Sequence, residues 1–247
     1  MKKGSLFGVG YAVGNMDEAI SEVLGRGRGL KGKYICFSNV HTLVTAIENE
    51  KYRRVLNGSA YTFPDGAPVA RELRKTGRDN AERIAGPDFM AALLKATADG
   101  GISHYFYGST DDSLDALEKT IKARYPGISI AGRYSPPFRK LSDEEDAEIT
   151  GIINKAAADI VWVSLGAPKQ EIFMYNHRGR INALMIGIGA GVDFLAGTVK
   201  RAPLWMQKAS LEWLYRLISE PKRLAKRYIV TNTKFFLYCL KRKSRLF

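Results

Sequence analysis

The sequence predicts an α/β protein: a Rossmann-like, mostly parallel sheet with helices on both faces, followed by a basic helical C-terminal appendage. Short apolar runs alternate with amphipathic stretches along residues 33–197, which is the pattern of the βαβ units that build parallel sheets. Beyond residue 203 this alternation stops, and the chain becomes helical, aromatic and basic. We therefore expect an α/β body over residues 1–197 and an appendage over residues 198–247.

The elements of the body follow in order. Ser142 and Glu145 have capping-box spacing at a helix start. Pro87 and Asp88 suit a first helical turn, and Pro221 marks a break between two helices of the appendage. Each strand is a short apolar run, and each helix repeats its apolar residues every three or four positions. The expected strands lie within 33–40, 60–66, 103–109, 128–138, 159–171 and 182–197, and the expected helices cover 41–59, 86–101, 113–127 and 142–157.

Charge is concentrated in the appendage. The chain carries a formal net charge of +13, and residues 198–247 hold thirteen Lys or Arg against only Glu212 and Glu220. That segment therefore has a net charge of +11 and leaves +2 for the body. Such a segment favours an anionic partner: a nucleic acid, an acidic membrane surface or a phosphorylated ligand.

Other global features point to the cytoplasm. Cys36 and Cys239 lie far apart, so neither a zinc site nor a disulfide framework is indicated, and the N-terminus does not read as a signal peptide. Residues 228–240 are too few and too polar to cross a bilayer. Their aromatic residues could insert into a membrane interface or complete the core, since both give the same amphipathic stripe.

Several polar and glycine-rich turns follow predicted strands. Because ligands of parallel α/β sheets bind at the carboxyl ends of the strands, we expect these turns to meet at one rim. Asp65, in the PDG turn at 64–66, either only stabilises the turn through a hydrogen bond to its own backbone or acts as a general base. In LGAPKQE (165–171), Lys169 could neutralise phosphate and Gln170 could read a uracil edge or a sugar hydroxyl. The rim residues are Asn39, Asp65, Gly108, 166–170 and 187–193.

Familiar ligand motifs are absent or incomplete. GIGAGVD (187–193) has Val192 where a dinucleotide-binding fingerprint needs its third glycine. The sequence contains no Walker A motif, no metal spacing around its three histidines, and no Asp-x-Asp pair to grip a diphosphate through a divalent cation. We therefore expect no metal and no bound cofactor.

Five sequence blocks carry a resemblance to a known family. PDG (64–66), ERIAGPDF (82–89), VSLGAPKQE (163–171), GIGAGVDFLAGTVKRAP (187–203) and LEWLYRLISEPKRLAKRY (211–228) resemble the WecG/TagA/CpsF glycosyltransferases, in order and spacing. The resemblance covers roughly residues 34–235. It implies an inverting, metal-independent enzyme that moves a hexose-type sugar from a UDP-sugar to a polyprenyl-diphosphate-linked sugar. It also implies peripheral association with the inner face of the cell membrane, and self-association.

The resemblance also implies roles for individual residues. Asp65 matches the catalytic base, Gln170 a glutamine needed for activity, and Arg83 an arginine beside the site. Asn39 matches a family asparagine and is a further catalytic candidate. Many members have a threonine just before that asparagine, whereas this chain has Ser38 there, which could supply the hydroxyl for a substrate contact. Appendage arginines would close over the site and hold the diphosphate, and backbone N–H groups at strand ends could assist. Further candidate substrate contacts are Gly86, Asp88, Gly108, Gly166, Lys169, Glu171, Arg216, Arg223 and Arg227.

Two rival functions come from other classes. The basic, aromatic tail could bind nucleic acid, although no reading motif accompanies it. Alternatively, the chain could be a non-catalytic protein that docks a polysaccharide-assembly complex to the membrane. The strand-end turns of a nearly neutral body favour the glycosyltransferase, with UDP-sugar, lipid-linked acceptor and anionic membrane as its partners and no nucleic acid.

Overall fold

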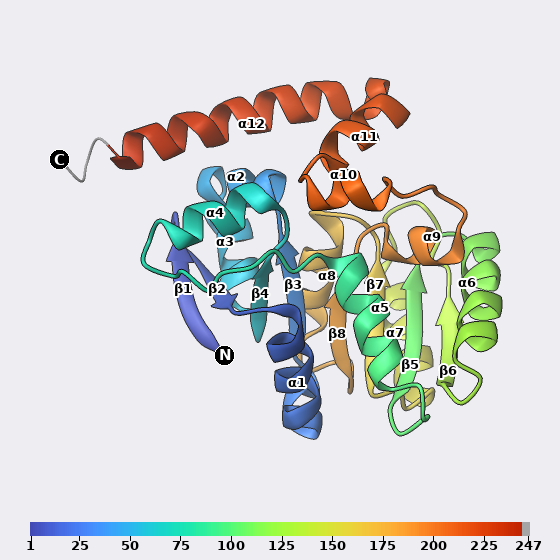
Figure 1. Ribbon diagram of the computed structural model, residues 1–247. Coiled ribbons are helices and arrows are strands. Elements are labelled where there is room, and N and C mark those ends of the chain that lie inside the picture. The colour runs from blue at the N-terminus through green and yellow to red at the C-terminus, as the bar shows by residue number, and fades with distance from the viewer. Residues whose placement is uncertain (244–247) are drawn as a thin grey trace.

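A six-stranded parallel sheet forms the centre of the protein. The computed structural model describes residues 1–243 (Figure 1). Every pair of neighbouring strands in this sheet is parallel, and the order is β4-β3-β8-β7-β5-β6. All carboxyl ends therefore point to the same edge. The strands are β3 (Tyr34–Ser38), β4 (Tyr61–Pro64), β5 (Ser103–Gly108), β6 (Ser129–Tyr134), β7 (Ile160–Ser164) and β8 (Leu184–Gly187).

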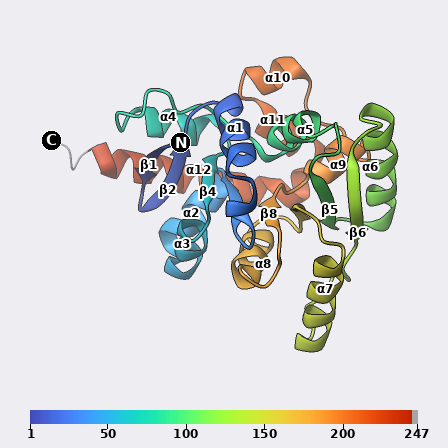
Figure 2. The ribbon, with the colours of Figure 1, turned by 90° about the horizontal axis from the view of Figure 1, so that it is seen from below.

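Helices cover both faces of the sheet, as predicted (Figure 2). Successive side chains of a strand point to opposite faces, so Tyr34 and Cys36 join one apolar core while Ile35 and Phe37 join the other. The first core packs against α3 (Glu50–Asn57), α7 (Asp143–Lys155) and α8 (Lys169–His177). The second packs against α1 (Met16–Arg26), α5 (Gly86–Ala96) and α6 (Asp111–Arg124).

Some elements differ from expectation. The helix expected over 41–59 is two helices, α2 (Val40–Glu48) and α3, because Asn49 takes extended φ/ψ angles and its side chain caps α3. The glycine-rich turns after β8 contain a short helix, α9 (Gly191–Ala196). Four segments had no predicted structure: an antiparallel hairpin of β1 (Lys2–Leu6) and β2 (Val9–Val13), the helix α1, a short 3₁₀ helix (Gly27–Leu30), and α4 (Ala67–Arg74).

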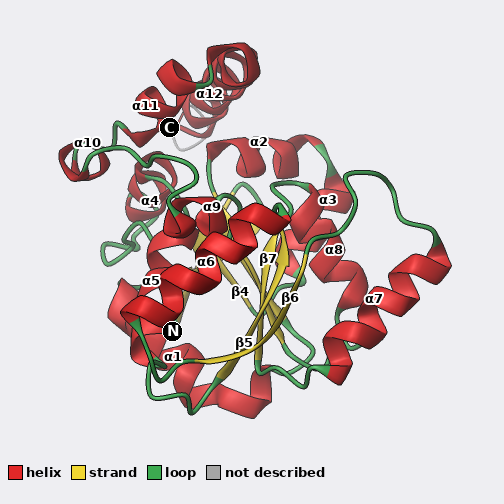
Figure 3. Ribbon diagram, turned by 90° about the vertical axis from the view of Figure 1, so that its right-hand side faces the viewer, coloured by secondary structure: helices red, strands yellow, loops and turns green. Residues whose placement is uncertain are grey.

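The appendage lies over the carboxyl edge of the sheet (Figures 1 and 3). It consists of α10 (Leu204–Lys208), α11 (Glu212–Ser219) and α12 (Pro221–Lys243), so the predicted break at Pro221 is confirmed. α12 packs along α2, and Glu48 of α2 pairs with Lys234 at 2.8 Å. Phe235 packs against the first core, whereas Phe236 is 61% exposed. The tail aromatics thus divide between body and solvent.

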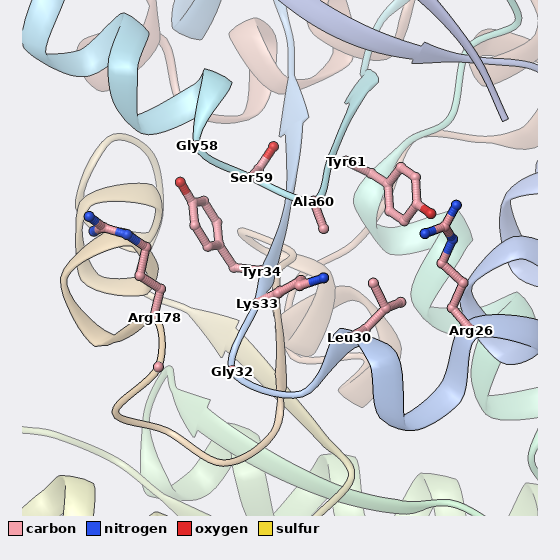
Figure 4. Close-up of a pocket in the computed structure, with 11 residues that line it drawn as sticks. Arg26, Leu30, Gly32, Lys33, Tyr34, Gly58, Ser59, Ala60, Tyr61 and Arg178 are labelled. Atoms are coloured by element: carbon pink, nitrogen blue, oxygen red, sulfur yellow. The ribbon is translucent and has the colours of Figure 1, made fainter.

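A surface hollow of about 470 Å³ lies at the amino ends of β3 and β4, opposite the appendage (Figure 4). Two tyrosines line it, and both hydroxyls already donate to protein groups: Tyr34 to the carbonyl of Val55 and Tyr61 to Glu22. The hollow has no part in the strand-end turns described below.

Candidate active site at the carboxyl edge of the sheet

The strand-end residues do gather at one rim. β3 and β4 are adjacent, with Ser38 opposite Pro64, so Asn39 and Asp65 follow neighbouring strand ends. β8, β7 and β5 continue the same sheet and bring their glycine-rich turns to this edge. Five segments far apart in the sequence are thereby placed side by side by the topology of one sheet.

Asp65 has the properties of a general base. Its side chain keeps some contact with solvent, yet burial raises the pKa of the carboxyl group from 3.8 to about 6. Arg83 and Arg216 oppose this rise, whereas Glu212 and Asp88 add to it. No residue whose side chain the structure describes donates a hydrogen bond to the Asp65 carboxylate. The group is therefore accessible and half-desolvated, and its pKa lies close to neutral pH.

Beside Asp65 lies a closed ring of four charged side chains, here called the arginine–carboxylate ring. Arg83 donates from Nη1 to Asp88 at 3.0 Å and from Nη2 to Glu212 at 2.8 Å. Arg201 donates from Nε to Glu212 at 2.9 Å and from Nη1 to Asp88 at 2.5 Å. Both acids thus bridge the same two arginines. Because Arg201 and Glu212 belong to the appendage, the ring joins it to the body at the rim.

Asn39 and Ser38 have different positions at the end of β3. The Asn39 amide oxygen caps α2, accepting from the backbone N–H groups of His41 and Thr42 at 3.0 and 3.2 Å. Ser38 is fully buried, and its hydroxyl is hydrogen-bonded to Tyr11 at 3.0 Å and Thr42 at 3.1 Å. Ser38 therefore faces the core rather than the rim, whereas Asn39 lies beside the turn of Asp65.

Gln170 and Glu171 are buried at the start of α8. The Gln170 side-chain oxygen accepts from the Gly189 N–H at 2.9 Å, and its nitrogen donates to Glu171 at 2.8 Å. Glu171 also accepts from the Tyr52 hydroxyl at 3.2 Å, and burial raises the pKa of its carboxyl group. This chain of bonds fixes the glycine-rich turn after β8 against α8, so both residues support the rim from beneath.

Of the remaining candidates in the body, some are open to a ligand at the rim and others are packed against neighbouring backbone. Lys169 is exposed at the rim, and Gly166 has a positive φ of 74° with open space around its Cα. Gly108 and Gly86 are close-packing positions instead. A Cβ on Gly108 would lie 2.4 Å from the Ser164 carbonyl oxygen, and one on Gly86 would lie 3.3 Å from the Ile188 Cα.

Two appendage arginines reach the site without carboxylate partners among the described side chains. Arg216 lies over the Phe194 ring, 5.8 Å from its centroid, and its charge acts on Asp65. Arg227 has a buried Nε with no hydrogen-bond partner. Burial lowers the pKa of His41 at the start of α2, and the charge of Arg227 lowers it further. The Arg223 side chain lies outside the part of the chain that the structure describes.

Sequence reasoning did not single out Arg201 or Glu212. Arg201 lies in one of the five blocks that resemble the family, and Glu212 is one of only two acids in a strongly basic segment. These two features were the signals in the sequence that could have drawn attention to them. Their partners, Asp88 and Arg83, lie 113 and 129 residues away, so only the folded chain joins them.

Within residues 1–243, no helix is both long enough and apolar enough to span a lipid bilayer. Nor do those residues include a group of three or more His, Cys, Asp or Glu side chains arranged to hold a metal ion.

Comparison with known proteins identifies the family. The model of the glycosyl transferase WecG/TagA/CpsF family matches residues 4–246, nearly the whole chain. The chain belongs to this family. It is therefore a glycosyltransferase, and the resemblance of the five sequence blocks is confirmed.

Two relatives of the chain are N-acetylglucosaminyldiphosphoundecaprenol N-acetyl-beta-D-mannosaminyltransferases. The chain is 34% identical to that of Bacillus subtilis strain 168 over 214 residues, covering 86% of this chain and 81% of the relative. It is 33% identical to that of Bacillus spizizenii strain W23 over 194 residues, covering 78% and 74% respectively.

Proposed function

We propose that this glycosyltransferase moves an N-acetylmannosamine-type sugar from a UDP-sugar to a polyprenyl-diphosphate-linked N-acetylglucosamine, with inversion and without a metal ion. The activity of the two Bacillus relatives supports this acceptor and this sugar. The observation that carries the proposal is Asp65, an accessible carboxylate at a strand end whose pKa is raised to about 6.

Asp65 acts as the general base. The acceptor hydroxyl oxygen attacks the anomeric carbon, the bond from that carbon to the β-phosphate oxygen breaks, and the hydroxyl proton passes to Asp65. UDP leaves from the opposite face of the sugar, which inverts the anomeric centre. At neutral pH most Asp65 carboxylates are ionised and still basic, and such a base contributes about 10²–10⁴-fold to the rate.

Guanidinium groups take the place of a metal at the diphosphate. Arg83 and Arg201 are both engaged in the arginine–carboxylate ring, and so are the acids Asp88 and Glu212. Arg216 and Arg227 remain to bind the leaving group through bidentate, charge-assisted hydrogen bonds. Lys169 lies exposed on the same rim and adds positive charge for a phosphate.

The appendage contacts an anionic membrane surface, and the enzyme works as a peripheral protein at the inner face of the cell membrane. Its positive charge and its exposed apolar side chains support this, because together they suit an interface of lipid headgroups. A lipid-linked acceptor would be presented there. The exposed apolar side chains of the appendage are Val199, Leu204, Trp205, Trp213, Ile218, Ile229, Val230, Phe236, Leu237 and Leu240. Self-association remains part of the proposal.

A transfer assay tests this function. The full chain is incubated with UDP-N-acetylmannosamine and a short-chain polyprenyl-diphosphate N-acetylglucosamine in the presence of a chelator. We expect an inverted, β-linked disaccharide from the wild type and none above background from Asp65→Asn. Metal-dependent transfer would reject the metal-free chemistry. Absence of transfer from every UDP-sugar, with strong salt-sensitive binding to random DNA, would favour the nucleic-acid alternative.

A further inference from the structure

Resting on the proposed function, we propose that Glu212 is a positioning residue that, together with Asp88, holds Arg83 away from the base Asp65. The two acids act as alternative partners for a cation that would otherwise neutralise the base. Glu212 does not touch the reacting atoms in this scheme, and it acts through Arg83.

The first step of the argument is the position of Arg83. Of the charged groups that act on Asp65, Arg83 has the strongest effect. Yet its guanidinium donates to Asp88 at 3.0 Å and to Glu212 at 2.8 Å, and it makes no hydrogen bond to Asp65 among the described residues. The cation with the strongest effect on Asp65 is therefore paired with two other carboxylates and not with Asp65.

The second step is that every carboxylate oxygen of the ring accepts from an arginine. Each of its four links joins one guanidinium nitrogen to one carboxylate oxygen, and each acid uses one oxygen for Arg83 and the other for Arg201. All four side chains are at most about one-third exposed, with Arg83 at 26% and Glu212 at 19%. A partly buried guanidinium that loses a partner gains strongly from finding another.

The third step is what happens without Glu212. Arg83 then has a free Nη2, and the neighbouring carboxylate that has no described cation partner is Asp65. Pairing of these two would stabilise ionised Asp65 and make it a weaker base. The other charged groups that act on Asp65 are Asp88 on α5 and Arg216 on α11, and neither changes in this substitution. The charge of Glu212 itself also raises the pKa of Asp65, so its loss adds to the fall and has to be separated from the effect of Arg83.

The experiment measures Asp65 directly. The side-chain carboxyl carbon of Asp65 is followed by ¹³C NMR against pH in the full chain, and its signal is assigned by its loss in Asp65→Asn. We expect a midpoint near 6 in the wild type and a midpoint at least about one pH unit lower in Glu212→Gln. Glu212→Asp keeps the charge and should restore most of the wild-type midpoint.

Two further variants separate this role from a structural one. In an Arg83→Gln background no cation is left to be captured, so adding Glu212→Gln should lower the midpoint much less than it does in the wild type. An equal lowering in both backgrounds would mean that Glu212 acts on Asp65 directly through its own charge, and would overturn the proposal. Glu118→Gln is the matched control, because Glu118 also accepts from two cations, Lys122 and Arg133, but lies on α6 beside the opposite edge strand. It should leave Asp65 unchanged. The acidic limb of the kcat/KM profile should move with the NMR midpoint in each variant.

An unchanged Asp65 midpoint in folded Glu212→Gln would overturn the proposal. If that variant does not fold, Asp88→Asn decides instead, since it frees the other nitrogen of Arg83 and should lower the midpoint as well. These titrations need no substrate. Failure of the wild type to transfer sugar would therefore reject the proposed function while the NMR result still decides the role of Glu212.

Discussion

The backbone N–H of Asp65 donates to the carbonyl oxygen of Ser38, with 2.9 Å between the two atoms. This bond extends the parallel pairing of β3 and β4 by one step beyond the strands. It holds the turn that carries the base to the end of β3, whose side chains on both faces are buried in the core. The position of the base is thus set by the sheet, although the residue itself belongs to a turn.

The pH dependence of catalysis should follow Asp65. We expect kcat/KM of the wild type to rise with pH through about 6, because the base is active only when ionised. Asp65→Asn should lose about 10²–10⁴-fold in kcat and also lose this limb. Steady-state rates between pH 5 and 8 check this, with UDP affinity by calorimetry as the control. An Asp65→Asn enzyme that retains the limb would contradict the assignment.

The same carboxylate should destabilise the fold above pH 6. A pKa raised from 3.8 to about 6 means that the folded state disfavours ionised Asp65. The penalty is absent below pH 3.8, grows between the two values, and is complete above 6. At pH 8 the free energy of unfolding of Asp65→Asn should therefore exceed that of the wild type by about 1 to 3 kcal/mol, and at pH 4 the two should be nearly equal. Urea unfolding at both pH values measures the difference. Equal gains at both pH values would rule out this explanation.

Nucleotide binding should depend on Arg216 and Arg227, the appendage arginines for which the described side chains offer no carboxylate partner. Arg216→Gln and Arg227→Gln each remove charge-assisted hydrogen bonds to the diphosphate, and we expect UDP affinity to fall roughly ten- to a hundredfold. Lys222→Gln is the matched control, because Lys222 is an exposed cation in the first turn of α12. Calorimetry in the presence of a chelator measures all three. An equal loss of UDP affinity in Lys222→Gln would mean that the appendage attracts UDP only through its overall positive charge, and would contradict specific contacts by Arg216 and Arg227.

Two glycines at the rim should respond differently to alanine. Gly108 combines a φ of 107° with a Cβ position 2.4 Å from the Ser164 carbonyl oxygen, so Gly108→Ala should cost more than about 2 kcal/mol. Gly166 has a φ of 74° and open space around it, and Gly166→Ala should cost about 1 to 2 kcal/mol from backbone strain alone. Urea unfolding compares the pair. A smaller cost at Gly108 would show that β5 and β7 can move apart there.

The sequence predicted the sheet and its rim because both depend on local signals. Apolar runs mark the strands, turn residues mark their ends, and parallel pairing brings the ends together. The break at Asn49 was missed because the apolar spacing continues through it, whereas the break depends on the side chain of that residue as a cap. The burial of Ser38 and the arginine–carboxylate ring were also missed, since each depends on partners from distant segments. The contacts proposed for substrate stay predictions.

The uneven distribution of charge has a consequence for how the molecule meets its surroundings. The positive segment overlies one end of the strands and the nearly neutral body extends from it, so the molecule has a permanent electric dipole along the sheet (Figure 1). Near an anionic surface this dipole experiences a torque that turns the rim toward the surface before any contact forms. The torque acts over roughly 8 Å at physiological ionic strength. Added salt should therefore make the orientation of the protein at its first contact with the surface more random. This should occur at lower salt concentrations than those that weaken the bound complex.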